Sequence, residues 1–494
     1  MSLVSGPFKS VPQAEQKLQK RPFFSLFPRL PRNIYLLLLF TTGKGFQLSI
    51  SALTLNYYIH SLGYQPEFIG LFSAMPAIGS LVGAVPVGRL ADRIGRKPVL
   101  LMTAILTPLS LALTALATSV PFLLAFGLLQ GLVSTAYWVT NLPLLVENTT
   151  EKQRVGVLAV NSFLLLGIGA LGNLLGGAIP EFVAGVLNVS AASTVPLRWG
   201  VFVAAAFTFI FGLPLWFLHE PKRVERRKTL DATVEAGIGG ETSGQVSSVV
   251  TAEAGSTAAS QGVSIDTTEA IDAAIPQVAS AIVAERISPA SPVVATEGAD
   301  EAGSGERWPF LLFFQLLLPD LVFTMGEGAV VALIQIYFVL RFHLLPGPLG
   351  IIFTISGLAG GVFSLTAPLF VKRWSKLRLV TTVQYLSAPL MVLIGLSPTL
   401  PVAIAGEYTR SFMRTLIEPI YAAFAMEKVS DKHRATLSGF YSITWSIGFS
   451  VGPAVGGWLQ TNVNLSTSFI FGAFCLLVAP TLLLAFFGRR ARNS

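Results

Sequence analysis

Long apolar runs, separated by short charged or Pro- and Gly-containing breaks, dominate this chain. The stretches Val99–Phe126 and Ser466–Phe487 contain no Lys, Arg, Asp or Glu at all. A helix needs about 20 mainly apolar residues to cross the hydrocarbon core of a membrane, and these runs are long enough. The pattern predicts an all-α integral membrane protein with twelve transmembrane helices. The spans begin near Asn33, Glu67, Val99, Pro121, Val155 and Trp199, and then near Pro309, Leu349, Leu379, Leu400, Ala435 and Thr467.

A change of composition separates the spans into two sets of six. Residues 221–307 are rich in Ala, Ser, Thr, Val, Gly and Glu, which is typical of a mostly disordered linker. The predicted organisation is a cytoplasmic tail (1–32), a six-helix half (33–220), a cytoplasmic linker (221–307), a second six-helix half (308–488) and a short cytoplasmic tail (489–494).

The two halves resemble each other in sequence. Most matches appear at a shift of 280 residues, and the first requires three further residues in an outer loop. Matched in order are Gly43–Gly45 with Gly326–Gly328, Gly70 with Gly350, Glu147 and Arg154 with Glu427 and Arg434, and Gly172–Gly177 with Gly452–Gly457. Duplicated halves with a binding site at their interface are characteristic of many secondary transporters.

Composition supports the membrane interpretation. Apolar residues make up 52% and charged residues 12% of the 494 positions, whereas soluble domains carry about 25% charged residues. The net charge of +8 does not indicate nucleic-acid binding, because the basic residues lie in short loops and tails. With the N-terminus inside, 22 Lys and Arg residues lie in inner loops and tails, and only Arg198 and Arg341 lie outside. Basic residues favour the cytoplasmic side, so both termini are predicted to be cytoplasmic and the location to be the plasma membrane.

The segment from Gly88 to Lys97, Gly-Arg-Leu-Ala-Asp-Arg-Ile-Gly-Arg-Lys, lies between the second and third spans. It resembles the signature loop of the major facilitator superfamily, and the Gly-Pro-x-x-Gly-Gly stretch at Gly452 is similar to that family's glycine-rich helix motif. The resemblance covers the chain except the linker and the first thirty residues. It implies the fold of that superfamily and transport by alternating access.

Charged residues at the cytoplasmic helix ends are candidates for a gate. The resemblance implies that Asp92 and Arg93 join Glu147 and Arg154 in a charge network that closes this side. Alternatively, the basic residues serve only as positive-inside anchors. The corresponding loop of the second half has no acid, which argues against a symmetric latch. The candidate gate residues are Gly88, Asp92, Arg93, Gly95, Arg96, Glu147, Arg154, Glu427 and Arg434.

The tenth span contains Glu407, Arg410, Arg414 and Glu418, spaced so that all four lie on one stripe of a helix. A charge at the centre of a membrane helix costs roughly 2.5–3.5 kcal/mol, so this stripe is expected to face the protein interior or an aqueous cavity. Acid and base alternate in a way that allows pairing along the helix. The stripe is therefore either part of the transport site or a set of pairs that only satisfy one another.

The matching stripe of the fourth span contains Gln130, Ser134 and Trp138. Gln130 and the glycine after it resemble the fourth-span motif of proton-coupled drug antiporters. The arginine of that motif is replaced by Gly127 here, which argues against drug–proton antiport unless an arginine of the tenth span compensates.

Lys44 and Glu327 occupy equivalent positions in the first spans of the two halves. The family architecture places those spans on either side of a central cavity. We therefore expect Lys44 and Glu327 to form a pair between the halves, with Glu327 as the protonatable coupling residue. The alternative is two independent charges that each reach water in the cavity.

The sequence predicts a secondary active transporter that uses protons to move a small solute, with export of an amphipathic or drug-like compound favoured. An importer of a nutrient or organic anion is an alternative, since Arg410 and Arg414 could bind a carboxylate or phosphate. A non-transporting membrane receptor is the alternative from another class. Enzymatic activity is not expected, because no clustered nucleophile and base are present. The expected partners are a small-molecule substrate, protons and the lipid bilayer, with no nucleic acid, no cofactor or metal, and a monomeric state.

Overall fold

The structure is a computed structural model that describes residues 30–219, 310–364 and 374–488. The predicted linker and most of both predicted tails lie outside these ranges. All regular elements within them are helices. The first half contains α1 (Arg32–Ser61), α2 (Pro66–Ile94), α3 (Arg96–Leu116), α4 (Val120–Glu147), α5 (Glu151–Ser162), the π-helical turn η3 (Phe163–Ile168), α6 (Gly169–Leu187), α7 (Thr194–Gly212) and the 3-10 turn η4 (Leu213–Phe217). The second half contains α11 (Phe310–Val331), α12 (Ile334–Phe342), α13 (Pro346–Ser364), α15 (Lys376–Leu396), α16 (Leu400–Lys428), α17 (Asp431–Asn462) and α18 (Thr467–Phe487).

Each predicted span coincides with one helix or with successive helical segments. The fifth span is α5, η3 and α6 in succession, the sixth is α7 with η4, and the seventh is α11 with α12. Nine spans in the described part of the chain are long and apolar enough to cross a membrane on those criteria alone. The eighth, tenth and eleventh spans (α13, α16 and α17) are less apolar or shorter, and α16 carries its charges on an inward face that does not need to be apolar.

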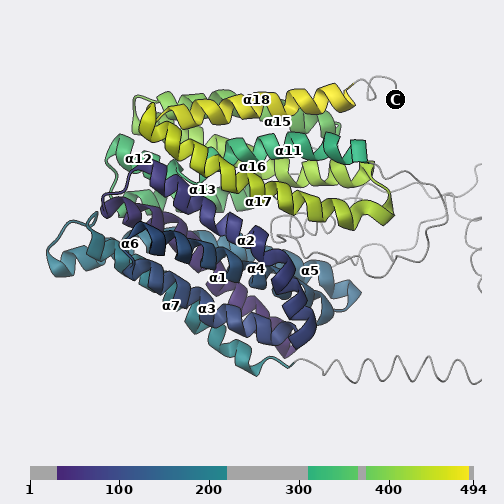
Figure 1. Cartoon of the computed structure of the whole chain (residues 1–494), viewed down its shortest axis with the longest axis horizontal. Helices are drawn as coiled ribbons and strands as arrows, with labels where there is room; N and C mark the ends of the chain where they lie inside the picture. Colours follow the sequence, from purple (N-terminus) through teal and green to yellow (C-terminus); the bar gives the residue numbers. More distant parts are fainter. Residues whose placement is uncertain (1–29, 220–309, 365–373, 489–494) are drawn as a thin grey trace, which may run out of the picture.

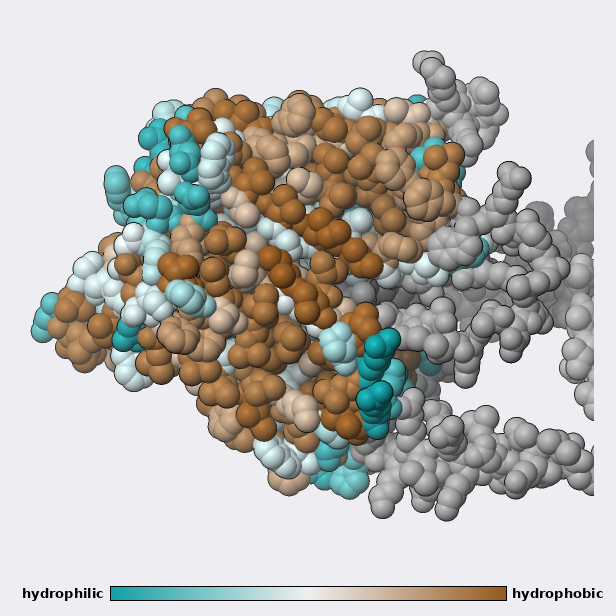
Figure 2. All heavy atoms as spheres, viewed as in Figure 1, coloured by the Kyte–Doolittle hydropathy of each residue, from teal (hydrophilic) through white to brown (hydrophobic). Residues whose placement is uncertain are grey.

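The surface of the bundle suits a lipid environment. Figure 2 shows hydrophobic residues over most of the visible face, with hydrophilic residues gathered toward its two ends. Large apolar side chains such as Phe182, Phe310 and Phe474 are more than half exposed. An exposed apolar surface of this extent would make a soluble protein aggregate, whereas lipid chains cover it without cost.

The two halves lie against each other as repeated units (Figure 1). α2 packs against α17, and the equivalent pair α13 and α6 packs in the same way. A Cβ atom on Gly70 would lie 2.1 Å from the carbonyl oxygen of Pro453, and one on Gly350 would lie 2.4 Å from that of Asn173. The repeat relates Gly70 to Gly350 and Asn173 to Pro453. The halves therefore join through two copies of one close backbone contact, which confirms the predicted pseudo-symmetry.

These contacts lie at the end of the bundle opposite Leu30 and Gly488, which we call the distal end. Hydrogen bonds between the halves reinforce it. The Tyr57 hydroxyl donates to the Leu344 carbonyl oxygen at 3.2 Å. The backbone N–H of Gly347 donates to Glu181 Oε1 at 3.0 Å. The halves are thus closed against each other at the distal end.

The seventh span is interrupted between α11 and α12. The turn at Ala332 and Leu333 frees backbone groups that a continuous helix would satisfy. Asn56 of α1 compensates, because its Nδ2 donates to the carbonyl oxygen of Ala332 at 2.8 Å. The break is therefore held by a side chain from the opposite half.

Candidate functional site

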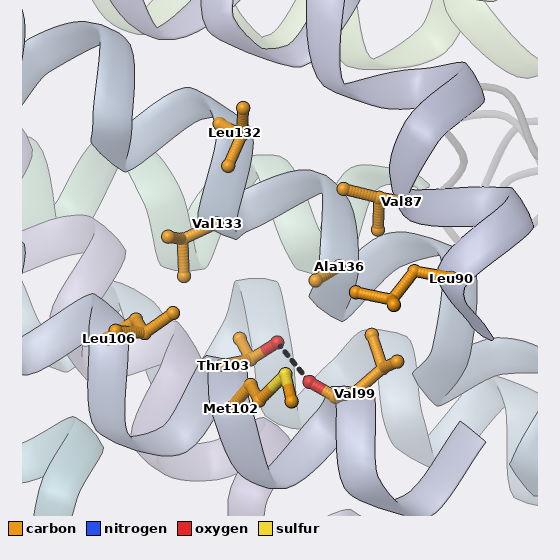
Figure 3. A pocket seen from close by; sticks show the side chains of 9 residues that line it. All are labelled: Val87, Leu90, Val99, Met102, Thr103, Leu106, Leu132, Val133 and Ala136. Atoms are coloured by element: carbon orange, nitrogen blue, oxygen red, sulfur yellow. Dashed lines mark hydrogen bonds between the residues drawn. The ribbon is translucent and has the colours of Figure 1, made fainter. Parts of the chain in front are cut away.

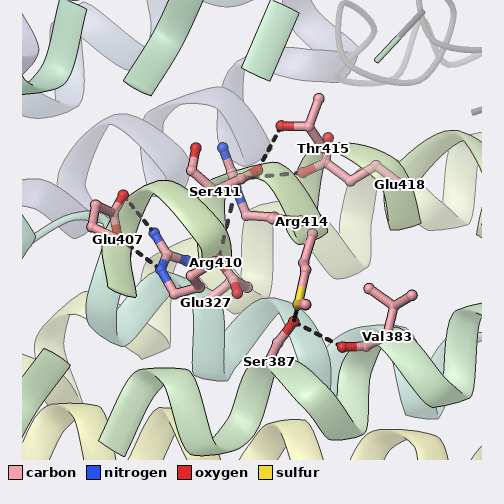
Figure 4. Close-up of polar contacts among 10 residues, drawn as sticks. Glu327, Val383, Ser387, Glu407, Arg410, Ser411, Arg414, Thr415 and Glu418 are labelled. Atoms are coloured by element: carbon pink, nitrogen blue, oxygen red, sulfur yellow. Dashed lines mark hydrogen bonds and ion pairs between the residues drawn. The ribbon is translucent and has the colours of Figure 1, made fainter. Parts of the chain in front are cut away.

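Five charged side chains from α11 and α16 form a buried group that we call the ionic cluster (Figure 4): Glu327, Glu407, Arg410, Arg414 and Glu418. Arg410 lies at its centre. Its Nη1 donates to Glu327 Oε2 at 2.9 Å, while its Nε and Nη2 donate to the two carboxylate oxygens of Glu407 at 2.9 and 3.1 Å. These three side chains are 3–4% exposed. Forked, charge-assisted bonds of this kind are the strong ones in a protein interior.

Arg414 forms the accessible side of the ionic cluster. Its Nη1 lies 3.4 Å from Glu418 Oε1, and its Nε lies 3.8 Å from Glu327 Oε2. The Arg414 and Glu418 side chains are 24% and 26% exposed, in contrast to the enclosed Arg410. The structure confirms both predicted pairs along the α16 stripe and its inward orientation. It also joins the stripe to α11 through Glu327.

The ionic cluster has more acids than bases. Three carboxylates face two guanidinium groups, so one negative charge is in excess when all five are ionised. Glu407 with Arg410 and Arg414 with Glu418 are pairs within α16, whereas Glu327 bridges from α11. A proton on Glu327 would leave each arginine with a carboxylate partner. The cluster can therefore take up one proton without leaving an arginine unpaired.

The predicted pair between Lys44 and Glu327 is wrong in this structure. Glu327 bonds to Arg410 of its own half, because the α16 stripe brings that guanidinium within reach. Lys44 is almost fully buried, and its Nζ has no hydrogen-bond partner in the described residues. The Nζ lies 5.8 Å from the centre of the Tyr137 ring, within the first half.

The polar groups that share this interior with Lys44 carry no formal charge, and we call them the neutral cluster: Thr41, Tyr137, Asn141 and Asn161. Thr41 donates to Asn161 Oδ1 at 2.7 Å, and the Tyr137 hydroxyl donates to Thr41 Oγ1 at 3.2 Å. Asn141 Nδ2 lies 3.2 Å from the Tyr137 hydroxyl oxygen. These residues were not predicted, because uncharged polar residues are common in packed membrane helices and no pattern distinguishes these four from the rest.

The three candidates of the fourth span have mixed surroundings. Gln130, the equivalent of Arg410, donates from Nε2 to Thr114 Oγ1 of α3 at 2.8 Å. The Trp138 ring packs edge-on against Tyr137, with centroids 4.9 Å apart. Ser134 is half-buried. Thus Gln130 hydrogen-bonds within its own half, whereas Arg410 joins an ionic group.

The gate candidates form one pair in each half. Glu147, at the end of α4, forms an ion pair with Arg96 at the start of α3. Glu427, at the end of α16, forms the matching pair with Lys376 at the start of α15. The residue numbers of both partners differ by 280. This one pair is therefore repeated in the two halves, with Lys376 of the second half in the position of Arg96, whereas the second half has no acid equivalent to Asp92.

Other parts of the predicted gate differ from expectation. The base that bonds Glu147 is Arg96, three residues after the expected Arg93. Arg154 Nε is buried without a hydrogen-bond partner in the part of the chain that is described. Arg434 Nε donates to the Met426 carbonyl oxygen at 3.1 Å. Arg434 thus bonds a carbonyl group near the C-terminal end of α16, a role that charge patterns alone do not distinguish from gating.

The turn of the loop motif follows the prediction. Gly95 separates α2 from α3 and has φ 95°, a left-handed conformation that favours glycine. Gly88 lies inside α2, one turn before Asp92. The turn at Gly95 therefore sets the direction in which Arg96 begins α3 and faces Glu147.

One apolar cavity of about 80 Å³ lies between α2, α3 and α4 (Figure 3). Three of the residues around it, Leu90, Met102 and Leu106, are 38–42% exposed on the lipid-facing surface. The hydroxyl of Thr103 is occupied by a bond to the Val99 carbonyl oxygen at 3.1 Å. The cavity is lined by Val87, Leu90, Val99, Met102, Thr103, Leu106, Leu132, Val133 and Ala136. It offers no charged group and suits a lipid chain better than a polar solute.

Asp320 is a further candidate site residue, which lies on α11 and not on the charged stripe of α16. Thr444 of α17 donates to its Oδ2 at 2.7 Å. Asp320 and Glu327 are the two charged residues of α11 and lie two turns apart on one face. That spacing was a signal available in the sequence.

A helical bundle of two repeated halves, with buried charges on facing helices, has the architecture of a secondary transporter. The model of the Major Facilitator Superfamily matches residues 35–405 and 316–494. The chain belongs to this superfamily of membrane transporters.

Curated relatives match a limited part of the chain. Solute carrier family 22 member 2 of Rattus norvegicus is 31% identical over 157 residues, which cover 31% of this chain and 25% of the relative. Major facilitator-type transporter psiT2 of Psilocybe cyanescens is 29% identical over 143 residues, 27% of each chain. The chain spans about a quarter of the length of these relatives.

Solved structures share the fold over most of the chain. A D-xylose–proton symporter has a TM-score of 0.62 at 13% identity, covering 91% of this chain and 97% of its own. A bacterial homologue of the human lysosomal transporter Spinster, in an inward-facing and unoccupied conformation, has a TM-score of 0.60 at 13% identity, covering 92% and 94%. At such identities the likeness establishes the fold only.

Proposed function

We propose that this chain is a proton-coupled secondary transporter that moves a small amphipathic solute across the plasma membrane by alternating access. It acts as a monomer, without a cofactor, with both termini in the cytoplasm. The observation that carries this proposal is the ionic cluster, in which three buried or half-buried carboxylates share two arginines. Such groups inside a membrane protein are expensive and typically mark ion or substrate pathways.

Glu327 is the coupling residue in this proposal. It is the carboxylate that ties α11 to α16, through Arg410 at 2.9 Å and Arg414 at 3.8 Å. When Glu327 takes up a proton, Arg410 keeps Glu407 and the link between the two helices weakens. A protonation event thereby changes the contact between two elements that line the interior, which is the kind of discrete switch that a transport cycle requires.

The rest of the fold supports alternating access. The close contacts at Gly70 and Gly350 seal the distal end twice, by the same geometry in each copy. Cytoplasmic termini would make the distal end the outer one, so the structure would represent a state closed to the outside. The ion pairs at Glu147 and Glu427 lie at the other end, where they hold neighbouring helices within each half.

The solute is amphipathic in this proposal because the accessible charges, Arg414 and Glu418, lie beside the apolar and aromatic core of the second half. Export is the preferred direction. Import of a nutrient or an organic anion is the second candidate. It is favoured by the partly exposed guanidinium of Arg414, which matches a carboxylate or phosphate.

Transport in proteoliposomes with an imposed pH gradient tests the proposal. A panel of dyes, sugars, organic anions and amino acids identifies the class that moves. Glu327→Gln is expected to reduce gradient-driven transport at least about tenfold, the effect of losing an interaction worth about 1.4 kcal/mol. Exchange of labelled for unlabelled solute, which needs no net proton movement, is expected to continue.

Glu67→Gln is the matched control, because Glu67 lies at the distal surface away from the ionic cluster, and the amide oxygen of glutamine can still accept the 3.4 Å hydrogen bond from Asn462 Nδ2. It should leave gradient-driven transport unchanged. Full gradient-driven transport by Glu327→Gln would contradict the coupling role. A folded protein that binds a compound of the panel but moves none would favour the receptor alternative.

A further inference from the structure

Asp320 has the features of a second proton site. It lies on the same face of α11 as Glu327, seven residues earlier and therefore about 10 Å along the helix axis. Its side chain is half-buried, and its Oδ2 lies at hydrogen-bond distance, 2.7 Å, from Thr444 Oγ1. The bridge ties α11 to α17, the pair of helices that makes the most extensive packing within the second half.

The two contacts of the Thr444 hydroxyl group bear on the protonation state of the Asp320 carboxyl group. The Thr444 oxygen lies 2.7 Å from Asp320 Oδ2 and 2.9 Å from the carbonyl oxygen of Tyr441. A hydroxyl group has one proton to donate, and a carbonyl oxygen can only accept. A threonine inside a helix commonly donates to a carbonyl oxygen one turn earlier. The single hydroxyl proton can serve either contact, so both contacts can be hydrogen bonds at the same time only if the Asp320 carboxyl group supplies a second proton.

The groups around Asp320 also favour a neutral acid. No ion pair joins Asp320 to a basic side chain in residues 30–219, 310–364 and 374–488. α16 places another acid, Glu418, on the stripe that contacts α11 through Arg414 and Glu327. α17 contributes Thr444 and Tyr441, and α18 has no charged side chain, with Cys475 its one ionisable group. A carboxyl group inside a membrane bundle with no cation beside it tends to hold its proton rather than carry an uncompensated charge.

We propose that Asp320 is a second proton-binding site, neutral in this conformation, which exchanges its proton with the ionic cluster through Glu418. The proton leaves the Asp320 carboxyl group and adds to the Glu418 carboxylate, so Asp320 becomes an anion and Glu418 becomes neutral. Arg414 then loses its partner at 3.4 Å but retains Glu327 at 3.8 Å. This exchange rests on the proposed proton coupling, whereas the proton on Asp320 does not.

Infrared spectroscopy of the purified full-length protein tests the proton directly, without any transport. A wild-type minus Asp320→Asn difference spectrum at neutral pH should contain the carbonyl band of a protonated carboxyl group. The band should shift in heavy water, and it should move in Thr444→Val, which removes the hydrogen-bond partner. Glu327→Gln should retain the band. Absence of the band from the difference spectrum would overturn the site whatever the protein transports.

Asp320→Asn keeps the size and neutrality of the protonated acid, so it should melt at the same temperature as the wild type. A clear fall in melting temperature would contradict a neutral Asp320. In proteoliposomes that show gradient-driven transport, this variant should move one proton fewer per solute, measured from the membrane potential at which net flux stops. An unchanged ratio with the band lost would overturn the exchange through Glu418 and leave the proposed function intact.

Discussion

The interiors of the two halves differ far more than the helices and helix contacts that the halves have in common, which we call the frame. The ionic cluster of the second half is held by paired charges, whereas the neutral cluster of the first half is held by hydroxyl and amide groups. Gln130 stands where the repeat places Arg410, and Lys44 stands where it places Glu327. The glycine contacts that join the halves are nevertheless duplicated at Gly70 and Gly350. Because the contacts that join the halves are duplicated, one half can acquire ionisable residues while the packing between the halves stays the same.

The largest expected difference between the halves is at their equivalent polar centres. Arg410→Leu leaves Glu327 and Glu407 buried without their cation, and breaking such a pair costs about 3–5 kcal/mol. Gln130→Leu removes one hydrogen bond to Thr114 and should cost only about 1 kcal/mol. Thermal unfolding in detergent, followed by the loss of folded protein on size-exclusion chromatography, measures both.

Arg410→Lys is the control that keeps the positive charge but removes the guanidinium group, which bonds two carboxylates at once. It should recover part of the stability, since an ammonium group cannot bond both Glu327 and Glu407 in the geometry that Arg410 uses. Equal losses of stability for Arg410→Leu and Gln130→Leu would show that the ionic cluster contributes no more to stability than the Gln130 hydrogen bond. The contrast between the halves would then disappear.

The shared frame should respond equally in both halves. A methyl group on Gly70 or Gly350 would meet a backbone carbonyl oxygen at 2.1 or 2.4 Å. Overpacking costs about 1–3 kcal/mol, which corresponds to a shift of roughly fivefold to a hundredfold away from the state closed at the distal end. Gly70→Ala and Gly350→Ala should therefore reduce closure to a similar extent.

Cross-linking at the distal end measures that shift. Cysteines at Glu67 and Thr461, whose positions are joined by a 2.8 Å hydrogen bond, report closure after Cys475 is replaced by serine. Gly185→Ala is the matched control, because a methyl group there meets nothing within 4 Å. A loss of cross-linking in Gly70→Ala but not in Gly350→Ala would show that the two seals are not equivalent.

The frame was predictable from the sequence, because it depends on features that repeat. Apolar length places the spans, and the 280-residue shift aligns Gly70 with Gly350 and Glu147 with Glu427. The sequence also predicted the pairing along the α16 stripe, since helical spacing alone brings Glu407 to Arg410. What repeats, or what lies within one helix, can be inferred without coordinates.

Contacts between helices were not predictable in the same way. Glu327 has candidate cations in both halves, and only the rotation of α11 against α16 decides for Arg410 and Arg414 over Lys44. The bridge from Asp320 to Thr444 joins residues 124 positions apart and has no pattern in the sequence. The site therefore depends on how the helices are rotated about their axes, which the composition of the spans does not determine.

Lys44 gives a smaller test of the contrast. Its buried Nζ has no hydrogen-bond partner in the described ranges, and leaving such a donor unsatisfied costs about 1–3 kcal/mol. Lys44→Met, which keeps the length of the side chain, should therefore raise the free energy of unfolding by up to that amount. Glu327→Met should lower it, because Arg410 loses a partner. Chemical denaturation in detergent measures both, and destabilisation by Lys44→Met would show that Lys44 has a partner after all.

The smallest effects are expected at the ion pairs near the ends of α4 and α16. The Glu147 and Glu427 side chains are 47% and 60% exposed, and exposed ion pairs contribute about 0–1 kcal/mol. Glu147→Gln and Glu427→Gln should each lower the melting temperature slightly and by similar amounts, and high salt should abolish the difference from the wild type because it screens exposed charges.

Exchanging the charges, as Arg96→Glu with Glu147→Arg, should restore the wild-type value if the pair acts only through its charges. A loss several times larger for one half, or one that persists at high salt, would place an asymmetry in the frame itself. The ionic cluster would then no longer be the principal difference between the two halves.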